Sequence, residues 1–372
     1  MLSYLSEWST EISFLRIFQY ITFRAGGAAF TAFLLTILLG PMTIRLLGRQ
    51  SATAPDHLDS VMPDEFRNPD KRHVPTMGGI LIVFAIVCTT VLWANPTNSL
   101  VHIFLALLVA LALVGFMDDY RKVIHQDKAG LVGRWKLLFQ IVIGLTVVWF
   151  LHGVPETGDN VRRLMLPFLK HPVIENMALW LALPFGCLVV VSASNAVNLS
   201  DGMDGLAVGC TAICAAAYAC FAYVCGHRVL ADYLLVPFVA GCSEVVIFAA
   251  AITGAGLGFL WHNCHPAGMF MGDTGSLSIG GAIGLIAVLV KQEILLLVVG
   301  GIFVVEAGSV ILQVSYFKLT RRLTGTPKRI FLCTPLHHHL QRKGWTETQI
   351  VIRFWILAIL LAAVGLATLK VR

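Results

Sequence analysis

Charged residues are scarce in this chain of 372 residues. Asp, Glu, Lys and Arg make up 13% of it, whereas they make up roughly 25% of an ordinary soluble domain. Hydrophobic residues make up 57%, and no polar stretch is long enough to fold as a separate soluble domain. These deficits exclude an ordinary soluble globular protein. They predict one polytopic membrane domain that comprises residues 1–372.

The sequence also lacks the signs of a secreted, disulfide-bonded protein. A cleavable leader begins with a basic region, but Glu7 and Glu11 precede the first apolar run. Most of the nine cysteines lie inside apolar runs, which argues against a disulfide scaffold. The net charge of +6 predicts no nucleic-acid partner, because membrane topology and contact with anionic membrane lipid account for the basic excess.

Long apolar runs dominate what is present. A membrane-spanning helix needs about 20 apolar residues, and runs of this length recur along the chain. We therefore predict an all-α integral membrane protein, a polytopic bundle of about ten transmembrane helices. The expected spans are 25–44, 75–93, 99–117, 137–155, 176–194, 205–225, 233–260, 274–290, 294–317 and 348–369.

The distribution of Lys and Arg predicts the orientation of the bundle. If the loop after the first span is cytoplasmic, most of the 27 basic residues fall in cytoplasmic loops, as the positive-inside rule requires. Both termini are then expected in the periplasm. The polar residues that stand out lie in the loops on the cytoplasmic side, at 46–74, 118–136, 194–205, 261–276 and 318–346.

Asp273 stands between two glycines at the start of the apolar run 277–290. A helix that begins here would point free N–H groups and the positive end of its dipole toward its surroundings, which favours phosphate. A carboxylate beside phosphate requires a divalent cation between them. The segment therefore has two interpretations: a cation and phosphate site, or an N-cap aspartate of a buried helix.

Asp118 and Asp119 end the third expected span. Adjacent carboxylates are costly there, because a helix C-terminus already carries partial negative charge. Either a bound metal ion or nearby basic groups should offset that cost, unless the pair begins a solvated loop. Consecutive helical residues point about 100° apart, so the two aspartates are expected to do different jobs. The basic candidates are Arg121, Lys122, Lys128 and Lys136.

A third polar cluster follows the fifth span, where Asn195, Asn198, Asp201 and Asp204 recur at every third position. On a straight α-helix the first and last of these would face opposite ways. Convergence of all four therefore requires a break in the helix, which glycines at 202 and 205 permit. Uncompensated carboxylates beside membrane spans indicate function, and a structural turn is the alternative.

Two further loops carry polar and aromatic groups. Asn263 and Phe270 suit recognition of a flat heterocycle by hydrogen bonding and stacking, whereas the spacing of the neighbouring histidines and cysteine matches no structural zinc pattern. The basic loop 318–346 contains His337, His338 and His339. These imidazoles can donate to phosphate oxygens, and zinc binding is the alternative.

Two glutamates lie deeper in expected spans. Glu244 interrupts the seventh span and Glu306 the ninth. Ionisable groups at such depth mark a proton path or pair with other groups structurally, and the sequence leaves both possibilities open.

Five segments together resemble one family. They are 71–79 (KRHVPTMGG), 117–120 (MDDY), 195–205 (NAVNLSDGMDG), 270–276 (FMGDTGS) and 335–339 (PLHHH). In this order they are similar to the phospho-N-acetylmuramoyl-pentapeptide-transferases, within the polyprenyl-phosphate sugar-1-phosphate transferase superfamily. The triple histidine points to this family within the superfamily.

The resemblance implies an Mg²⁺-dependent enzyme of the bacterial inner membrane. Such an enzyme moves phospho-MurNAc-pentapeptide from UDP-MurNAc-pentapeptide to undecaprenyl phosphate, giving lipid I and UMP at the cytoplasmic face. The resemblance also implies a homodimer. Two rivals remain from the residues alone: a related transferase that uses UDP-GlcNAc, and a secondary transporter, whose charged groups should lie nearer the bilayer midplane.

The resemblance also implies roles for individual residues. Asp273 would ligate Mg²⁺, Asp118 would deprotonate or orient the acceptor phosphate, and Asp119 would support it. His337 and His338 would complete the catalytic group. The residues expected to bind substrate are Lys71, Lys136, Asn195, Asn198, Asp201, Asp204, Asn263, Phe270, Gly272, Ser276, Gln313 and His339.

Overall fold

The computed structural model describes residues 1–49, 74–124 and 130–371. Within these ranges nine helices are long and apolar enough to cross a membrane, a further apolar helix has 15 residues, and no β-sheet forms. The ten helices are α1 (Ile21–Arg49), α2 (Gly79–Trp93), α3 (Ser99–Ile124), α4 (Gly133–Gly153), α6 (Leu179–Ser200), α7 (Leu206–Gly226), α9 (Cys242–Asn263), α10 (Gly272–Leu289), α12 (Gly301–Thr324) and α14 (Glu347–Ala367). The predicted all-α polytopic fold is confirmed.

The expected spans coincide with these ten helices, but some of the predicted ends are wrong. Tyr233, the expected start of the seventh span, lies in a short helix instead. The chain then turns through Leu235 (φ 54°) and Gly241 (φ 77°) before α9 begins. The ninth expected span is divided into a short helix and α12. The shorter helices are η1 (Leu2–Thr10), η2 (Ser13–Gln19), α5 (Gly158–Val161), α8 (Arg228–Leu234), α11 (Leu296–Val299), α13 (Leu336–Arg342) and η5 (Thr368–Lys370).

Helix α10 is the most deeply buried of the long helices, with 89% of its apolar window inside the protein. Small residues allow this close packing: a Cβ added at Gly280 would lie 2.7 Å from the backbone oxygen of Ala193 on α6, and one at Gly281 would overlap Leu111 on α3. Inside a bilayer, helices associate largely through such van der Waals contact. The bundle is therefore built around the helix that carries Asp273 in its first turn.

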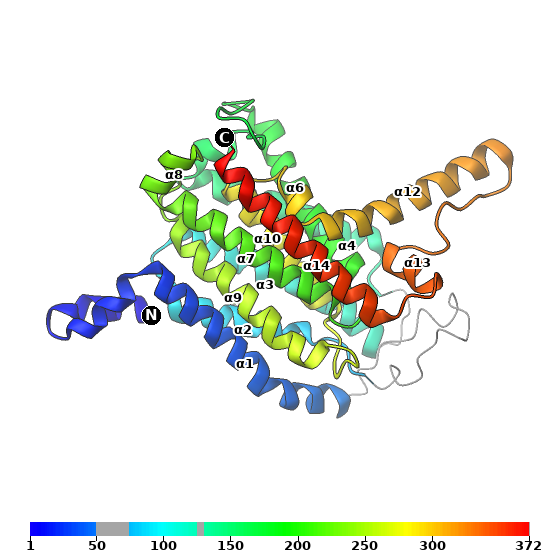
Figure 1. Cartoon of the computed structure of the whole chain (residues 1–372), viewed down its shortest axis with the longest axis horizontal. Coiled ribbons are helices and arrows are strands. Elements are labelled where there is room, and N and C mark those ends of the chain that lie inside the picture. Colours follow the sequence, from blue (N-terminus) through cyan, green and yellow to red (C-terminus); the bar gives the residue numbers. More distant parts are fainter. Residues whose placement is uncertain (50–73, 125–129, 372) are drawn as a thin grey trace.

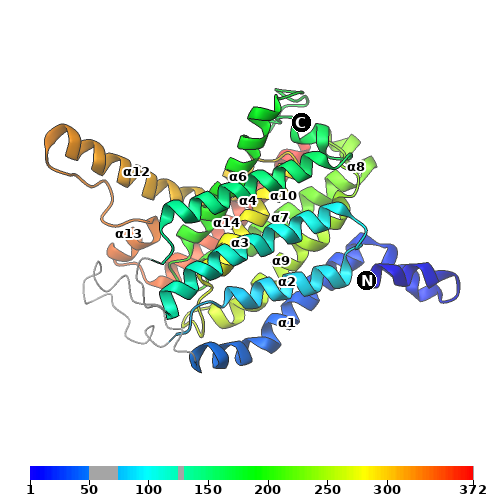
Figure 2. The same cartoon turned by 180° about the vertical axis from the view of Figure 1, so that it is seen from behind.

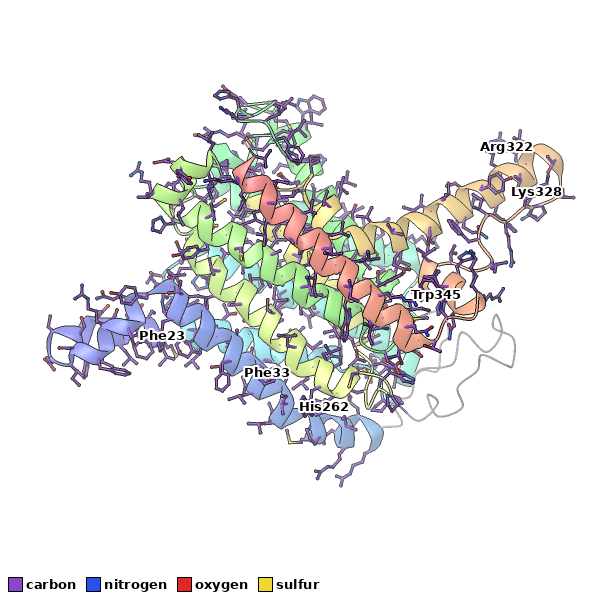
Figure 3. The ribbon with its side chains drawn as sticks, viewed as in Figure 1. Phe23, Phe33, His262, Arg322, Lys328 and Trp345 are labelled. Atoms are coloured by element: carbon purple, nitrogen blue, oxygen red, sulfur yellow. The ribbon has the colours of Figure 1, made fainter. Side chains whose placement is uncertain are left out.

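The two ends of the bundle differ. Helix α1 begins and α14 ends at one end, whereas α13 lies at the other (Figures 1 and 2). Helix α12 leaves the bundle as an arm, with Arg322 and Lys328 near its tip (Figure 3). Leu319 and Leu323 are exposed on this arm, as expected of a segment in contact with lipid or the interface. All nine cysteines are free, as predicted.

The two intramembrane glutamates lie in different surroundings. Glu244 is in the first turn of α9 and accepts from both terminal nitrogens of Arg24 at 2.9 and 2.6 Å. It also accepts from the backbone N–H of Asn95 at 2.7 Å. A buried carboxylate held by a bidentate guanidinium is a satisfied ion pair. Glu244 is therefore a structural acid that joins α1 to α9, and Glu306 is considered with the histidines below.

Candidate active site

Three carboxylates meet where α3 ends and α10 begins. Asp118, Asp119 and Asp273 are each at most 9% exposed, and one oxygen from each lies within 4.8 Å of the others. Asp118 and Asp119 are adjacent in the chain, whereas Asp273 is far from them, and the burial of α10 against α3 brings the three together. An arrangement of hard oxygen donors at this spacing is suited to a divalent cation.

Asp119 holds the start of α10. Its Oδ1 accepts from the backbone N–H of Asp273 at 3.0 Å, and its Oδ2 accepts from the backbone N–H and the hydroxyl of Thr274 at 2.9 and 2.7 Å. Free N–H groups at a helix start need such acceptors. A Cβ at Gly272 (φ 71°) would lie 2.8 Å from Asp119 Oδ2, so glycine permits this approach.

The interpretation of Asp273 as an N-cap is wrong. Helix α10 already includes Gly272, so its N-cap residue is Met271 and not Asp273. The Met271 side chain forms no capping hydrogen bond. Asp119 supplies the missing acceptors from another helix. The carboxylate of Asp273 is therefore left to face the cluster.

Two lysines offset the charge of Asp118 and Asp273. Lys122, one turn after Asp118 on α3, forms ion pairs with Asp118 and with Asp273 Oδ2, the latter at 3.0 Å. Lys136, in the first turn of α4, lies 2.5 Å from Asp273 Oδ2 and 3.8 Å from Asp118 Oδ2. Asp118 Oδ1 also accepts from the backbone N–H of Leu131 at 2.7 Å. The structure thus supplies the positive groups that the adjacent aspartates required, and gives the two aspartates different partners.

The predicted helix break after the fifth span is confirmed. Helix α6 ends at Ser200, and Gly205 (φ 79°) precedes α7. Asn198, on the last turn of α6, reaches the cluster: with its amide nitrogen facing Asp273, it donates to Asp273 Oδ1 at 2.9 Å and accepts from Lys136 at 3.3 Å. The amide orientation follows from these partners.

Ser276 and Asn195 take other positions. The hydroxyl of Ser276 is buried and donates to Gly272 O at 2.9 Å. With the Asn198 amide in the same orientation, the hydroxyl also accepts from the Asn198 NH₂ group at 2.9 Å. Asn195 donates instead to Gln140 on α4 at 2.7 Å and to a backbone oxygen of its own helix. Ser276 thus orients Asn198, whereas Asn195 joins α6 to α4.

Asp201 and Asp204 follow in the loop between α6 and α7. Burial, the nearby carboxylates of Asp273 and Asp119, and that of Asp204 raise the pKa of Asp201 to about 8, and a backbone hydrogen bond from Gly272 opposes this rise only in part. The raised pKa favours the neutral, protonated form of Asp201. Loss of its carboxylate charge reduces repulsion next to the cluster.

Asp204 connects the loop to two other segments. Its Oδ2 lies 3.0 Å from His265 Nδ1 and accepts from the backbone N–H of Ala267 at 3.2 Å. The backbone N–H of Asp204 donates to Glu347, the first residue of α14, at 2.9 Å. His262 instead faces α1, 3.2 Å from Ile37 O. The two rings of this loop thus face different elements, which argues against one zinc ion bound by both. His265 instead forms a group with Asp204 and Glu347, whose ligand atoms lie within 4.8 Å of one another.

The segment 75–79 runs beside Phe270. The backbone N–H of Phe270 donates to Pro75 O, and its oxygen accepts from Gly78 N, both at 2.8 Å. Asn263 braces the same region, because it accepts from Gly205 N at 3.0 Å and donates to Met269 O at 2.8 Å. Phe270 is partly exposed, so its ring remains available for stacking. Lys71 lies outside the described residues.

The three histidines belong to α13. His337 is fully buried and His338 is 6% exposed, with their ring centroids 4.2 Å apart. His339 Nδ1 accepts from Leu332 N at 3.1 Å. Burial, together with the nearby Lys343 ammonium, lowers the pKa of His339, which favours the neutral imidazole. Among the described residues, none of these three histidines belongs to a group whose ligand atoms could hold a metal ion together. The zinc interpretation of this loop therefore gains no support.

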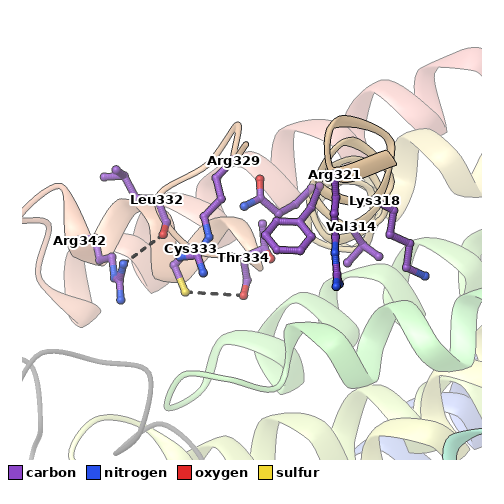
Figure 4. A pocket seen from close by; sticks show the side chains of 10 residues that line it. Val314, Lys318, Arg321, Arg329, Leu332, Cys333, Thr334 and Arg342 are labelled. Carbon is purple, nitrogen blue, oxygen red and sulfur yellow. Dashed lines mark hydrogen bonds between the residues drawn. The ribbon is translucent and has the colours of Figure 1, made fainter. Parts of the chain in front are cut away.

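A pocket of about 410 Å³ lies beside α13, under the arm of α12 (Figure 4). Gln313 lies on its wall, accepts from Ile330 N and Phe331 N at 3.0 Å and donates to Phe331 O. This residue therefore fixes the basic loop against α12. The cationic residues that line the pocket are Lys318, Arg321, Arg329 and Arg342.

Sequence reasoning missed several residues that shape the site. Lys122 was expected only as one of four basic neighbours, although it contacts both acidic groups. Thr274 and Glu347 were missed. The position of Thr274 next to Asp273 was a usable signal, whereas Glu347 carries only the signature of a capping box with Thr346 and Gln349.

Comparison with known proteins defines the class first. A family model described as glycosyl transferase family 4 matches residues 100–291. The match includes all three carboxylates of the cluster and both lysines. The chain is thus a polytopic membrane protein of this transferase family.

Full-length relatives define the particular family. A phospho-N-acetylmuramoyl-pentapeptide-transferase of Methylacidiphilum infernorum (isolate V4) is 45% identical over 373 residues, which cover 100% of both chains. Proteins of the same name from Desulforapulum autotrophicum and Rhodopseudomonas palustris (strain BisB18) are each 46% identical, over 99% and 100% of both chains. The chain belongs to the phospho-N-acetylmuramoyl-pentapeptide-transferase family, a family of transferases in peptidoglycan synthesis. This membership argues against the transporter alternative.

Proposed function

We propose that the protein transfers phospho-MurNAc-pentapeptide from UDP-MurNAc-pentapeptide to undecaprenyl phosphate. The products are lipid I and UMP, in the first membrane step of peptidoglycan synthesis. The site faces the cytoplasm, and the protein resides in the bacterial inner membrane. The observation that carries the proposal is the buried cluster of Asp118, Asp119 and Asp273 with two lysines, in a chain that matches relatives of that name along its whole length.

The residues present fit Mg²⁺. This ion prefers carboxylate oxygens and substrate phosphates, and both oxygens of Asp119 are already held by the start of α10. Asp273 and Asp118 are therefore the groups that would hold it, with Asp273 as the principal ligand. When bound, the ion would neutralise negative charge on the donor diphosphate and on the leaving UMP.

The mechanism we favour is direct displacement. A phosphate oxygen of the acceptor attacks the β-phosphorus of the donor, the bond from that phosphorus to the bridging oxygen breaks, and UMP departs with the electron pair. The acceptor phosphate is already an anion, so it needs positioning and charge neutralisation more than a strong base. Lys122 and Lys136 supply positive charge at this point. Exchange of labelled UMP into the donor without lipid would instead support a phospho-enzyme.

The acceptor is a lipid, and the bundle suits it. Apolar helices flank the carboxylates, so a polyprenyl chain can remain in the bilayer while its phosphate reaches the cluster at the helix ends. The partly exposed Phe270 is available to stack on the uracil of the donor. A homodimer is part of the same proposal. It rests on the family resemblance, and light scattering of the detergent-solubilised protein tests it.

The decisive experiment measures UMP release from UDP-MurNAc-pentapeptide in detergent. The parent should release UMP only with both undecaprenyl phosphate and Mg²⁺. Asp273→Asn should lower the rate by about 10²- to 10³-fold, the size of losing one preorganised electrostatic group. Asp232→Asn is the matched control, because Asp232 is exposed on α8, away from the cluster.

Two outcomes would contradict the proposal. Release from UDP-GlcNAc but not from UDP-MurNAc-pentapeptide would identify the related GlcNAc-1-phosphate transferase. No release from a folded parent with either donor would reject phosphosugar transfer altogether.

A further inference from the structure

Glu306 and His337 form a buried pair between α12 and α13. The Nδ1 atom of His337 lies 2.9 Å from Glu306 Oε2, and the backbone N–H of His337 donates to Glu306 Oε1 at 3.1 Å. Both residues are fully buried. Each carboxylate oxygen thus accepts a hydrogen bond from the same residue. Because both oxygens of Glu306 bind His337, the glutamate is suited to orienting the imidazole of His337.

This contact fixes the tautomer of the imidazole. A carboxylate accepts hydrogen bonds, so Nδ1 must carry the proton that it donates to Glu306. Among the described residues, Nε2 of His337 is a buried nitrogen with no hydrogen-bond partner. Leaving such an atom unpaired is costly, so a buried unpaired nitrogen in a native protein calls for an explanation.

The unpaired nitrogen faces the loop between α6 and α7. A Cβ added at Gly202 would overlap His337 Nε2 and would lie 3.4 Å from His338 Nε2. Gly202 is next to Asp201, in the loop whose Asp201 and Asp204 are expected, from the family resemblance, to bind substrate. Only glycine leaves the imidazole room to reach this loop.

A purely structural role accounts poorly for the pair. Glu244, the other intramembrane glutamate, has a guanidinium partner that satisfies its charge. Glu306 has no arginine or lysine partner among the described ion pairs, and its carboxylate meets an imidazole instead. A buried carboxylate is costly unless its partner is specific.

We propose that Glu306 is a positioning residue, which holds His337 so that Nε2 is directed toward the 201–205 loop and toward a phosphate or sugar oxygen of the substrate. This inference rests on the proposed function. The sequence left the role of Glu306 open, and this inference gives that residue, which lies inside α12, a part in the reaction. Glu306 itself touches no substrate.

Replacement of Glu306 by glutamine should change the tautomer of His337. In Glu306→Gln the amide keeps the shape of the side chain but offers one acceptor oxygen and one NH₂ group. The backbone N–H of His337 can only donate and takes the oxygen, so the NH₂ group faces Nδ1. The proton must then move to Nε2, which reverses the polarity of the atom directed at the loop.

The test is a double-mutant cycle on Glu306→Gln and His337→Gln, with UMP release measured in single turnover with enzyme in excess. This format keeps strongly impaired variants measurable. Glu306→Gln should lower the rate by about 10- to 100-fold, as loss of a partner that orients a functional histidine does. In the His337→Gln background the same change should alter the rate by no more than about twofold. The thermal transition should stay close to that of the parent.

Ser309→Ala is the matched control. Its hydroxyl donates to the backbone oxygen of Glu306 at 2.7 Å and is buried one turn further along α12, so its loss perturbs the helix without touching the imidazole. This variant should keep the parent rate.

The outcomes separate the two proposals. Absence of UMP release from the parent and from Ser309→Ala counts against the transfer reaction. With those two active, equal losses from Glu306→Gln in both backgrounds, or no loss at all, would overturn the positioning role. A thermal transition that falls in parallel with the rate would also overturn it.

Discussion

Asp118 and Asp119 are adjacent in the chain but have different partners and different roles. Asp119 gives its oxygens to Asp273 N–H and to Thr274, whereas Asp118 is paired with Lys122 and bound by a loop N–H. Asp119→Asn should therefore lower the free energy of unfolding by about 1–3 kcal/mol, because it removes an acceptor from buried donors. Asp118→Asn should lower the activity with a smaller loss of stability. Thermal denaturation in detergent, beside the UMP assay, measures both.

The reverse pattern would contradict this assignment. If Asp118→Asn unfolded earlier than Asp119→Asn, the start of α10 would not depend on Asp119. Asp232→Asn again controls for the loss of one acidic group at an exposed position.

The sequence predicted the residue types of the site better than their partners. Asp273, Asp118 and Asp119 stood out because carboxylates beside apolar spans are costly. The N-cap alternative for Asp273 failed because the true acceptor, Asp119, is far away in the chain. A single sequence carries no signal for such a contact. For the same reason Glu306 was noticed but its partner His337 was not.

The start of α2 depends on close contact with α10. The backbone N–H of Gly79 donates to Met271 O at 2.8 Å, and a Cβ at Gly79 would overlap the backbone N of Gly275. Backbone on both sides leaves little room to adjust. Gly79→Ala should therefore cost about 1–3 kcal/mol of stability, as overpacking does, and should lower activity by displacing the first turn of α10.

Gly308→Ala provides the comparison for this variant. Gly308 is also helical, on α12, but a Cβ there meets nothing within 4 Å. Alanine should be neutral or stabilising at that position, because it restricts the unfolded chain. The thermal transition of both variants measures the difference. Equal transitions for the two would show that α2 and α10 can separate without cost.

At the scale of elements, the apolar runs predicted ten helices and the spacing of polar groups predicted the break after α6. The ends of α2 and α9 were not predictable in the same way. Residues 75–78 lie outside α2 because Pro75 and Gly78 form backbone hydrogen bonds with Phe270, a tertiary effect, and Met77 takes a left-handed conformation (φ 74°). The turn before α9 depends on Leu235 in the left-handed region, which its apolar side chain does not indicate.

The whole molecule has one functional end. The carboxylate cluster lies where α3 ends and α10 starts, and α13 lies at the end of the bundle opposite the start of α1 (Figures 1 and 2). Because most of the 27 basic residues fall in loops at the site end, the positive-inside rule predicts that this end is cytoplasmic. The opposite end of the bundle, where α1 begins and α14 ends, should then face the periplasm.

Reporter fusions test this topology. A fluorescent protein that folds only in the cytoplasm should be dark when fused after Arg372 and bright when fused after Thr324, at the end of the α12 arm. A periplasmic phosphatase should give the opposite pattern. Fluorescence after Arg372 would invert the bundle and place the carboxylates at the periplasmic face. A donor made in the cytoplasm could not then reach them, so the same result would contradict the proposed reaction as well as the topology.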